Sequence, residues 1–515
     1  MPETTAPEDT LMPYAEGFNN EQYLGEQTEE ILERVKRFDN KLYLEFGGKL
    51  FFDYHAARVL PGYDPNIKMR LLQKLADKAE IILCIHAGAI ERKKVRADFG
   101  VTYDVDAMRM IDDMRSWGVP LCAVVVTRYE DQPSAKLFCN KLERRGIRVY
   151  THRPTRGYPT DVNRIVSDEG YGANPYIETT KPLVVVTGPG PGSGKLATCL
   201  SQLYHEAKQG NVGGYAKFET FPIWNLPLKH SVNVAYEAAT ADLHDVNLID
   251  SFHLDRYNET TVNYNRDVEA FPVVQAILER ILGEPLYHSP TDMGVNRAAI
   301  GIYDDAACQH AAQQEIIRRY FRYCTEYAMG LVEKCTVDRA QQLMTAAGLE
   351  THQRVVVLPA RQAAEEAHDH HEGNEGVFCG AALQLPDGSI ITGHNSPKLH
   401  AASALILDTI KSLSDAPREI NLLASAVMKS VGDLKTNILG KKSLSLDLEE
   451  TLIALAISAT TNPTAAACMK KLPLLRGCDI HMTHIPAPGD DKGLRQLGVN
   501  LTCDANFSTK DLFVS

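Results

Sequence analysis

The sequence predicts an α/β fold, with a multidomain chain whose N-terminal part carries an open, mostly parallel sheet of the Rossmann or P-loop kind. Three observations lead to this class. Short apolar runs typical of buried strands alternate with amphipathic helical patterns, the connections between them are short, and a long helical pattern interrupts the alternation after residue 303. Strands and helices that alternate with short connections favour parallel pairing of the strands.

The same pattern divides the 515 residues into four regions, with enough chain for more than one hydrophobic core. We expect a polar tail over 1–20, an N-terminal α/β domain over 21–303, a helical segment over 304–350 and a C-terminal α/β domain over 351–515.

The N-terminal elements follow from local signals. LYLEF (42–46) and KLFFDY (49–54) flank Gly47-Gly48, which predicts a hairpin. Helical spacing predicts helices over 67–79, 104–118, 133–146 and 196–210. Apolar runs predict strands over 81–86, 121–127, 147–152, 183–187 and 246–250.

The C-terminal half begins with helical patterns, and Thr336 is expected to cap the second of them. VVVLPA (355–360) predicts a return to strand, and the polar run 365–376 predicts a loop. A hairpin over 380–394 is expected to turn at Asp387-Gly388. Further helices are predicted over 399–414, 419–437, 446–459 and 463–472, and late strands in DIHMTH and VNLTC.

Composition narrows the class of partner. The chain has 54 basic and 66 acidic residues, a net charge of −12, and no long basic tract, so nucleic acid is not an expected partner. Its start is acidic and proline-rich rather than basic and apolar, and no run approaches the roughly 20 apolar residues of a membrane span. Eleven scattered cysteines without a C-x-x-C pair favour reduced thiols, so we expect a cytoplasmic protein that contacts no membrane.

The stretch KPLVVVTGPGPGSGKLATCL is the clearest functional signal. A strand that ends in a glycine-rich loop and enters a helix directs several backbone N–H groups and the positive end of the helix dipole at one point, which favours an anion. Lys195 at the helix start adds a positive charge. The candidate phosphate-binding residues are Gly188, Gly190, Gly192, Ser193, Gly194, Lys195 and Thr198.

This loop departs from the G-x-x-x-x-G-K-[ST] motif at two positions. Pro189 stands where the first glycine is required, and Leu196 replaces the hydroxyl that ligates magnesium. Phosphate binding is therefore favoured over ATP hydrolysis by the usual magnesium arrangement. A purely structural strand-to-helix turn remains the alternative.

Other polar segments could complete a site. Asp250 closes VNLID as a Walker-B-like carboxylate would, and His253 follows it, so Asp250 and His253 are the candidate catalytic residues. Their alternative is a strand-ending aspartate that caps the next turn. Segment 215–230 is a candidate lid over a base or sugar, with Lys217, Glu219, Trp224 and Lys229. Segment 289–297 is a candidate anion-binding loop, with Asp292 and Arg297.

The histidines do not indicate a metal site. His368, His370 and His371 lie in a charged connector typical of solvated side chains, and His481 and His484 point to opposite faces of a strand. GAALQLPDGSIITGHNSPKLHAASALI resembles the opening of the cytidine-deaminase-like fold. The zinc chemistry of that fold needs H-x-E and P-C-x-x-C, whereas His400 is followed by Ala401 and Ala402 and the cysteine positions hold Thr464 and Ala467. We therefore expect a degenerate form of this fold without deaminase chemistry.

The whole chain resembles the UPF0371 family of bacterial proteins, also described as a domain of unknown function. The resemblance is carried by VVVTGPGPGSGKLATCLSQLYHE, GYAKFETFPIWNLPLKH, NVAYEAATADLHDVNLID, TTVNYNRD and SPTDMGVN. It implies an α/β N-terminal part, a helical segment and a smaller C-terminal α/β domain, and it implies no reaction.

The residues together predict a protein that binds a nucleotide or another phosphorylated small molecule at the 188–198 loop, with phosphoryl transfer as the first choice if it is an enzyme. One alternative is a non-catalytic assembly or regulatory protein, and another is a transferase or hydrolase acting on a nucleoside-like substrate. A homo-oligomer is expected, and the sequence does not indicate a cofactor.

Overall fold

The computed structural model describes residues 16–38, 41–96 and 100–509, so most of the expected polar tail lies outside the described residues. Contacts within the chain form two compact units. The N-terminal unit comprises residues 17–240 and 245–312, and the C-terminal unit contains residues 241–244 and 313–515. Each unit is described by itself.

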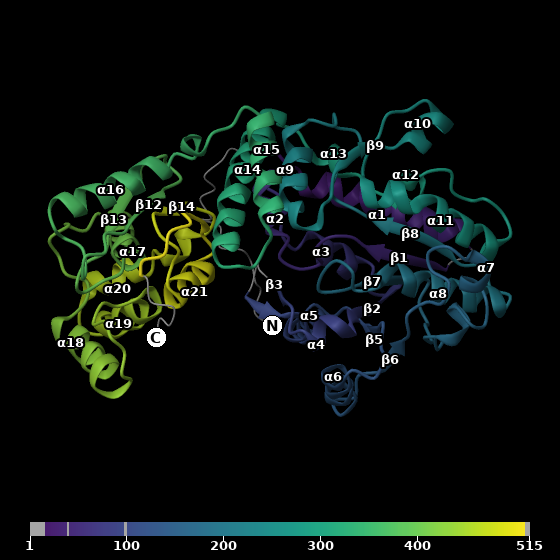
Figure 1. Cartoon of the computed structure of the whole chain (residues 1–515), viewed down its shortest axis with the longest axis horizontal. Coiled ribbons are helices and arrows are strands. Elements are labelled where there is room, and N and C mark those ends of the chain that lie inside the picture. Colours follow the sequence, from purple (N-terminus) through teal and green to yellow (C-terminus); the bar gives the residue numbers. More distant parts are fainter. Residues whose placement is uncertain (1–15, 39–40, 97–99, 510–515) are drawn as a thin grey trace. The chain divides into compact units, whose positions relative to one another are not determined.

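The N-terminal unit is built on a seven-stranded sheet in the order β11-β8-β1-β7-β2-β5-β6 (Figure 1). All neighbouring strands pair in parallel. The strands are β1 (Leu42–Phe46), β2 (Ala79–His86), β5 (Leu121–Thr127), β6 (Val149–His152), β7 (Leu183–Thr187), β8 (Gly214–Phe218) and β11 (Gly294–Val295). The central strands are buried along their whole length, because helices cover both faces of a parallel sheet. The predicted parallel α/β architecture is confirmed at this level.

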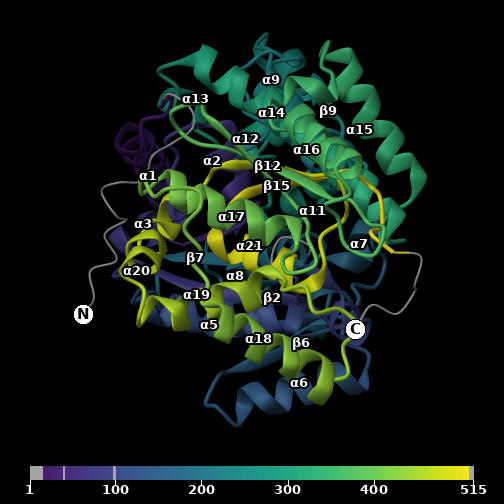
Figure 2. The ribbon, with the colours of Figure 1, turned by 90° about the vertical axis from the view of Figure 1, so that its left-hand side faces the viewer.

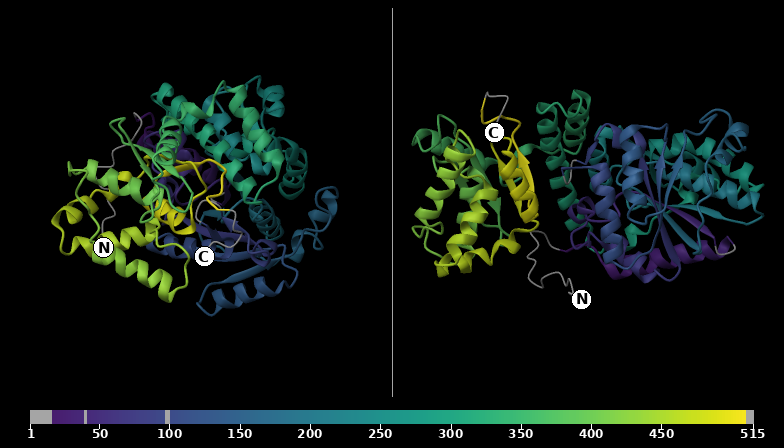
Figure 3. Two further views of the ribbon diagram at one scale, coloured as in Figure 1. Left: turned by 60° about the vertical axis from the view of Figure 1, so that its left-hand side comes forward. Right: turned by 90° about the horizontal axis from the view of Figure 1, so that it is seen from below.

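The order of the strands shows that the chain winds in both directions across this sheet. The connections from β1 to β2, from β2 to β5 and from β5 to β6 run toward one edge, whereas the connection from β7 to β8 runs toward the other. Because parallel crossovers are right-handed, these two sets of helices lie on opposite faces (Figure 3). The neighbours β7 and β2 therefore send their following segments apart, and this is the topological switch point of the sheet.

Helices connect the strands of the N-terminal unit. They are α1 (Asn20–Arg37), α2 (Tyr54–Val59), α3 (Ile67–Lys74), α4 (Ala87–Glu91), α5 (Tyr103–Ser116), α6 (Pro133–Glu143), α7 (Val162–Ile165), α8 (Lys195–Lys208), α9 (Ser231–Ala239), α10 (Ser251–Tyr257), α11 (Asn265–Leu282), α12 (Pro290–Met293) and α13 (Ala298–Gly301). The helices predicted over 67–79, 104–118, 133–146 and 196–210 are present as α3, α5, α6 and α8, each ending two to five residues earlier than predicted.

One predicted strand pairing is wrong, and one predicted strand lies outside the large sheet. The expected hairpin about Gly47-Gly48 does not form, because β1 pairs in parallel with β7 and β8, and the chain after it reaches α2 without a second strand. Strand β9 (Asn247–Ile249) does not join the large sheet but pairs antiparallel with β10 (Val262–Tyr264). A further short pair joins β3 (Val95–Arg96) and β4 (Val101–Thr102).

The C-terminal unit holds a smaller mixed sheet in the order β13-β12-β14-β15 (Figures 1 and 2). The predicted hairpin is confirmed as β12 (Gly380–Gln384) and β13 (Ile390–His394), and the late strands are β14 (Asp479–Met482) and β15 (Asn500–Cys503). Its core helices are α17 (Ala401–Ser412), α18 (Ser425–Asp433), α19 (Leu448–Ala459), α20 (Pro463–Met469) and α21 (Pro488–Leu497). A π-helical turn, Leu434–Ile438, follows α18.

Three details of the helical region differ from the prediction. Helix α14 (Asp305–Ala328) runs across the boundary between the units, and α15 (Lys334–Ala346) begins after Glu333 rather than at Thr336, which is buried inside it. The apolar run 355–360 belongs to α16 (Val357–Asp369), not to a strand, and this helix also takes in the first part of the predicted polar loop. None of the helices that the structure describes has the length and apolar character of a membrane-spanning segment.

Candidate functional site

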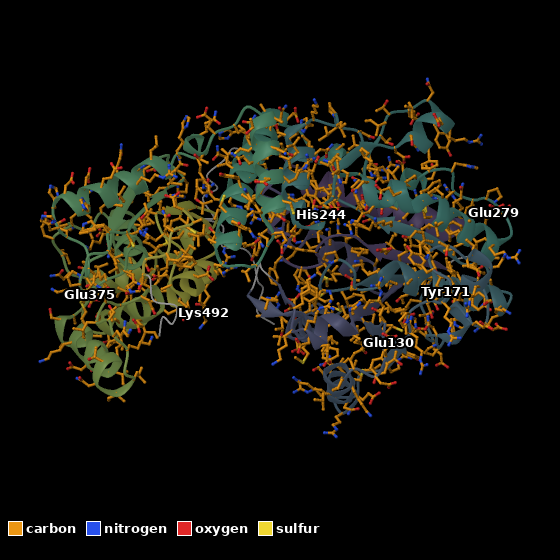
Figure 4. All side chains as sticks on the ribbon, in the orientation of Figure 1. Glu130, Tyr171, His244, Glu279, Glu375 and Lys492 are labelled. Atoms are coloured by element: carbon orange, nitrogen blue, oxygen red, sulfur yellow. The ribbon has the colours of Figure 1, made fainter. Side chains whose placement is uncertain are left out.

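The glycine-rich loop lies at the carboxyl end of β7 and leads directly into α8. Strand β7 sits between β1 and β2, so the loop projects from the middle of the sheet at the switch point. Ligands of open α/β sheets bind outside the carboxyl ends of the strands at such points. Glu130, labelled in Figure 4, belongs to the loop that follows β5 at the same edge.

Three loop glycines are held by their neighbours. A Cβ on Gly188 would lie 2.5 Å from the carbonyl oxygen of Cys84, and one on Gly190 would lie 2.5 Å from the hydroxyl of Tyr103. Gly194 has a φ of +89°, and a Cβ there would lie 2.7 Å from the side chain of Thr127. The backbone of the loop is thus packed against the ends of β2 and β5, which fixes its path.

The hydroxyl groups of the loop are used within the protein. Ser193 is buried, and its Oγ donates to the carbonyl oxygen of Gly190 at 2.8 Å. Thr198 is fully buried and donates to the carbonyl oxygen of Gly194 at 3.0 Å. Both hydroxyl groups therefore donate to carbonyl oxygens of the loop, and a role of Thr198 in phosphate binding stays a prediction.

The start of α8 is open to an anion. Its N-cap residue, Gly194, has no side chain to accept hydrogen bonds from the first turn, and the helix is 14 residues long. The N–H groups of Lys195, Leu196 and Ala197 accordingly have no acceptor within the helix, as is usual at a helix N-terminus. Within the described part of the chain, the partly exposed Lys195 forms neither an ion pair nor a hydrogen bond through its ammonium group.

Cations gather around His86, the last residue of β2. Its Nδ1 accepts a hydrogen bond from the N–H of Ala89 at 3.1 Å and so caps α4. Burial and then the positive charges of Arg128, Arg92 and Lys94 lower the pKa of His86. These three cations are exposed and form no ion pair with the described residues. Three cations thus lie near the carboxyl end of β2, on a protein that is negative overall.

Arg128 also has an unusual backbone. It directly follows β5 with a φ of 50°, in the left-handed region. Such a conformation costs a non-glycine residue about 1–2 kcal/mol and persists where surrounding structure imposes it, often at functional sites.

Asp250 and His253 lie elsewhere in the N-terminal unit. Asp250 is fully buried and caps α10 by accepting from the N–H of His253, and its other oxygen accepts from the N–H and hydroxyl of Thr291 at 3.1 and 2.7 Å. His253 shares a hydrogen bond of 2.9 Å between its Nδ1 and the hydroxyl of Ser289. Since β9 is not part of the large sheet, the structure does not bring these two residues to its carboxyl edge through that strand.

These contacts support the wall of a small cavity of about 230 Å³. The cavity is lined by Arg34, Arg37, Phe38, Tyr257, Leu286, Tyr287, Thr291 and Asp292. Asp292 accepts hydrogen bonds from Tyr257 and from the N–H of His288, so its carboxylate holds the wall together. Arg297, in the same predicted anion loop, pairs with Glu30 of α1.

The predicted lid segment is divided between the sheet and a loop. Lys217 lies inside β8, and Glu219 directly follows this strand. Both residues therefore belong to the carboxyl end of β8 rather than to a lid. Lys229 is exposed, whereas the ring of Trp224 packs against Gly294, where a Cβ would lie 2.3 Å from it.

In the C-terminal unit, His400 is the residue before the first turn of α17, and its Nδ1 lies 2.7 Å from a carboxylate oxygen of Asp490. Although burial opposes it, the hydrogen bond and charge of Asp490 raise the pKa of His400. Among the residues that the structure describes, no group of three or more His, Cys, Asp or Glu side chains is arranged to hold a metal ion.

Sequence reasoning missed the cations around His86. Arg128 follows the predicted strand 121–127 directly, and His86 ends the predicted strand 81–86, so a search of the residues after each parallel strand would have found both. Arg92 and Lys94 offered no comparable signal, because they reach the edge only through the short helix α4.

Fold and site together define an α/β protein with a glycine-rich strand-to-helix loop at the switch point of a parallel sheet. The chain belongs to the UPF0371 family: models described as "Domain of unknown function DUF1846", N-terminal and C-terminal, match residues 16–348 and 352–513. UPF0371 proteins of Clostridium botulinum (strain Alaska E43 / Type E3) and Clostridium tetani (strain Massachusetts / E88) are each 55% identical to it over 498 residues, which is 96% of this chain and 99% of theirs.

Proposed function

We propose that this protein binds a phosphorylated small molecule, a nucleotide or a sugar phosphate, at the 188–198 loop of a Rossmann- or P-loop-like site. The observation that carries the proposal is the coincidence of two independent features at the switch point. One is the open N-terminus of α8 with Lys195, and the other is the set of three cations around His86; none of these four side chains forms an ion pair with the residues that the structure describes. A phosphate dianion would use both kinds of group.

The loop supplies charge and N–H donors, but not the metal-binding hydroxyl of a Walker-type loop. Leu196 is apolar, and the hydroxyl of Thr198 is used by the carbonyl oxygen of Gly194. If the protein catalyses a reaction, phosphoryl transfer fits a site of this kind, because that reaction depends chiefly on positioning and on neutralising charge. In this proposal Asp250 and His253 have a structural role, because their hydrogen bonds hold α10 and α12 together.

Calorimetric and thermal-shift titrations with inorganic phosphate, pyrophosphate, hexose 6-phosphates, AMP and ATP would test this proposal. We expect at least one of these anions to bind, and Lys195→Ala to weaken it by about tenfold, the effect of losing roughly 1.4 kcal/mol of charge-assisted hydrogen bonding. Lys136→Ala is a matched control, because Lys136 is an exposed lysine near the start of another helix, α6.

The competing explanation is that the loop is only a tight turn. The close packing around Gly188, Gly190 and Gly194 is compatible with it. In that case none of the phosphate compounds would raise the melting temperature, and Lys195→Ala would behave as Lys136→Ala does.

A further inference from the structure

A buried group of acids and bases lies at the carboxyl end of β8. The ammonium of Lys217 lies 2.8 Å from a carboxylate oxygen of Glu219, and it also contacts the carboxylate of Asp267 and the hydroxyl of Tyr264. It lies over the ring of Tyr264 as well, 4.6 Å from its centre. Asp267 comes from the first turn of α11, so three separate elements converge on one lysine.

This acid–base cluster, Lys217, Glu219, Asp267 and Tyr264, holds more acid than base. Burial first, and then the neighbouring carboxylate of Asp267, raise the pKa of Glu219 to about 7, against the opposing effect of Lys217. Burial alone would lower the pKa of Lys217, but the carboxylates of Asp267 and Glu219 hold it well above its ordinary value. Glu219 is thus a carboxyl group that exchanges its proton near neutral pH, the property that general acid–base catalysis requires.

The cluster lies on the same edge of the sheet as the glycine-rich loop. Strand β1 is the only strand between β7 and β8, so the ends of β7 and β8 lie two strand spacings apart, about 10 Å. Glu45 of β1 lies on the strand between the acid–base cluster and the glycine-rich loop. It accepts a hydrogen bond from Tyr215 at 2.9 Å on the side of Lys217, and its charge acts on Cys84 and Cys199 together with that of Lys195.

Between the two places the chain presents glycine. Strand β1 ends at Phe46 and is followed by Gly47 and Gly48. Gly47 is held against the carbonyl oxygen of Phe218, to which its N–H donates at 2.8 Å, and Gly48 has a φ of +68°. Neither residue has a side chain that could stand between the loop and the cluster, as a ligand lying across β1 would require.

We propose that Glu219 is the general acid–base residue for a ligand whose phosphate is held by the glycine-rich loop, with Lys217 as its charge partner. This inference rests on the proposed function. The ligand would span about 10 Å, the size of a hexose phosphate or a nucleoside monophosphate. In the neutral form that binding favours, Glu219 donates its proton to an oxygen of the ligand and becomes a carboxylate, whose charge the Lys217 ammonium balances. In the reverse step the Glu219 carboxylate takes that proton back from the ligand.

Calorimetry at pH 7 in two buffers of different ionisation enthalpy measures both binding and proton exchange. The probes are inorganic phosphate, which reaches only the loop, and hexose 6-phosphate and AMP, which reach across β1. We expect the two longer ligands to bind with uptake of up to about half a proton by Glu219, because their negative charge and the exclusion of water favour its neutral form. Glu219→Gln should abolish this uptake and weaken both ligands by about tenfold, while inorganic phosphate binds unchanged.

Glu206→Gln is the matched control. Glu206 is also a buried carboxylate and accepts hydrogen bonds from Tyr43 and Tyr176, but it lies 11 residues along α8 from Lys195, about 16 Å away. Proton uptake and affinity should survive this substitution. The inference is overturned if the longer ligands bind to wild-type and Glu219→Gln protein alike and without a difference in proton uptake, a result that leaves the phosphate-binding proposal intact.

Failure of the phosphate-binding proposal would look different. No probe would bind, and the test of Glu219 would then be a ¹³C NMR titration of labelled glutamate carboxyls in the free protein, assigned with Glu219→Gln. A Glu219 resonance that titrates near pH 7 supports the acid–base centre, and one that titrates in the ordinary carboxylate range overturns it.

Discussion

The two positive-φ glycines of the loop should respond very differently to alanine. Gly192 has a φ of +72° and no heavy atom within 4 Å of a Cβ added to it, whereas a Cβ on Gly194 would lie 2.7 Å from Thr127. Both substitutions incur the left-handed penalty of about 1–2 kcal/mol. Gly194→Ala also displaces Thr127, whose hydroxyl donates to the carbonyl oxygen of Ser193 at 2.8 Å, and so loses roughly 1 kcal/mol more.

We therefore expect Gly192→Ala to lower the free energy of unfolding of the N-terminal unit by about 1–2 kcal/mol, and Gly194→Ala to lower it by about 2–3 kcal/mol. The chain suits the measurement, because its two tryptophans, Trp117 and Trp224, both lie in the N-terminal unit. Urea unfolding followed by tryptophan fluorescence thus reports on this unit. Equal losses, or a larger loss at Gly192, would refute the packing described for the loop.

Three further predictions concern buried charges. Asp250→Ala removes the cap of α10 and the acceptor of Thr291, and should cost about 2–3 kcal/mol in urea unfolding while leaving phosphate binding unchanged; a loss of binding with normal stability would contradict the structural role. Lys68→Met leaves the buried Asp53, 2.9 Å away, without its partner and should cost about 3–5 kcal/mol, most of which the double variant with Asp53→Asn recovers. The native chain holds the proton of Glu219 more tightly than the unfolded chain, since its pKa rises from 4.5 to about 7, so this stabilisation is complete below pH 4.5 and is lost as the pH rises through 7. Urea unfolding between pH 4.5 and 8 should show wild type losing up to about 3 kcal/mol relative to Glu219→Gln, and parallel pH profiles would contradict the raised pKa.

Long periodic segments could be predicted from the sequence, because the residues that determine each of these elements are neighbours in the chain. The β7 strand, the loop and α8 are one example, since a five-residue apolar strand, the glycines and a 14-residue amphipathic helix lie next to one another in the chain. The loop residues of the candidate site were predicted for the same reason.

Pairing partners could not be predicted in the same way. Gly47-Gly48 carries a hairpin signal, but the long-range fit of β1 between β7 and β8 outweighs it. VNLID yields a strand of only three residues, and nothing local determines that β9 pairs with β10 instead of the large sheet. The run 355–360 is apolar and short, which does not distinguish a strand from the first turn of α16.

The acid–base cluster escaped prediction because its members are far apart in sequence and unremarkable one by one. Lys217 and Glu219 are two residues apart on β8, while Asp267 and Tyr264 arrive through β10 and α11. Only the folded chain shows that a buried lysine meets more carboxylates than it can neutralise. Replacing such a group by apolar side chains is often neutral or stabilising, so its presence is not explained by stability. The raised pKa of Glu219 and the position of the cluster on the same sheet edge as an open helix N-terminus are the grounds on which we propose that Glu219 serves the chemistry of a ligand.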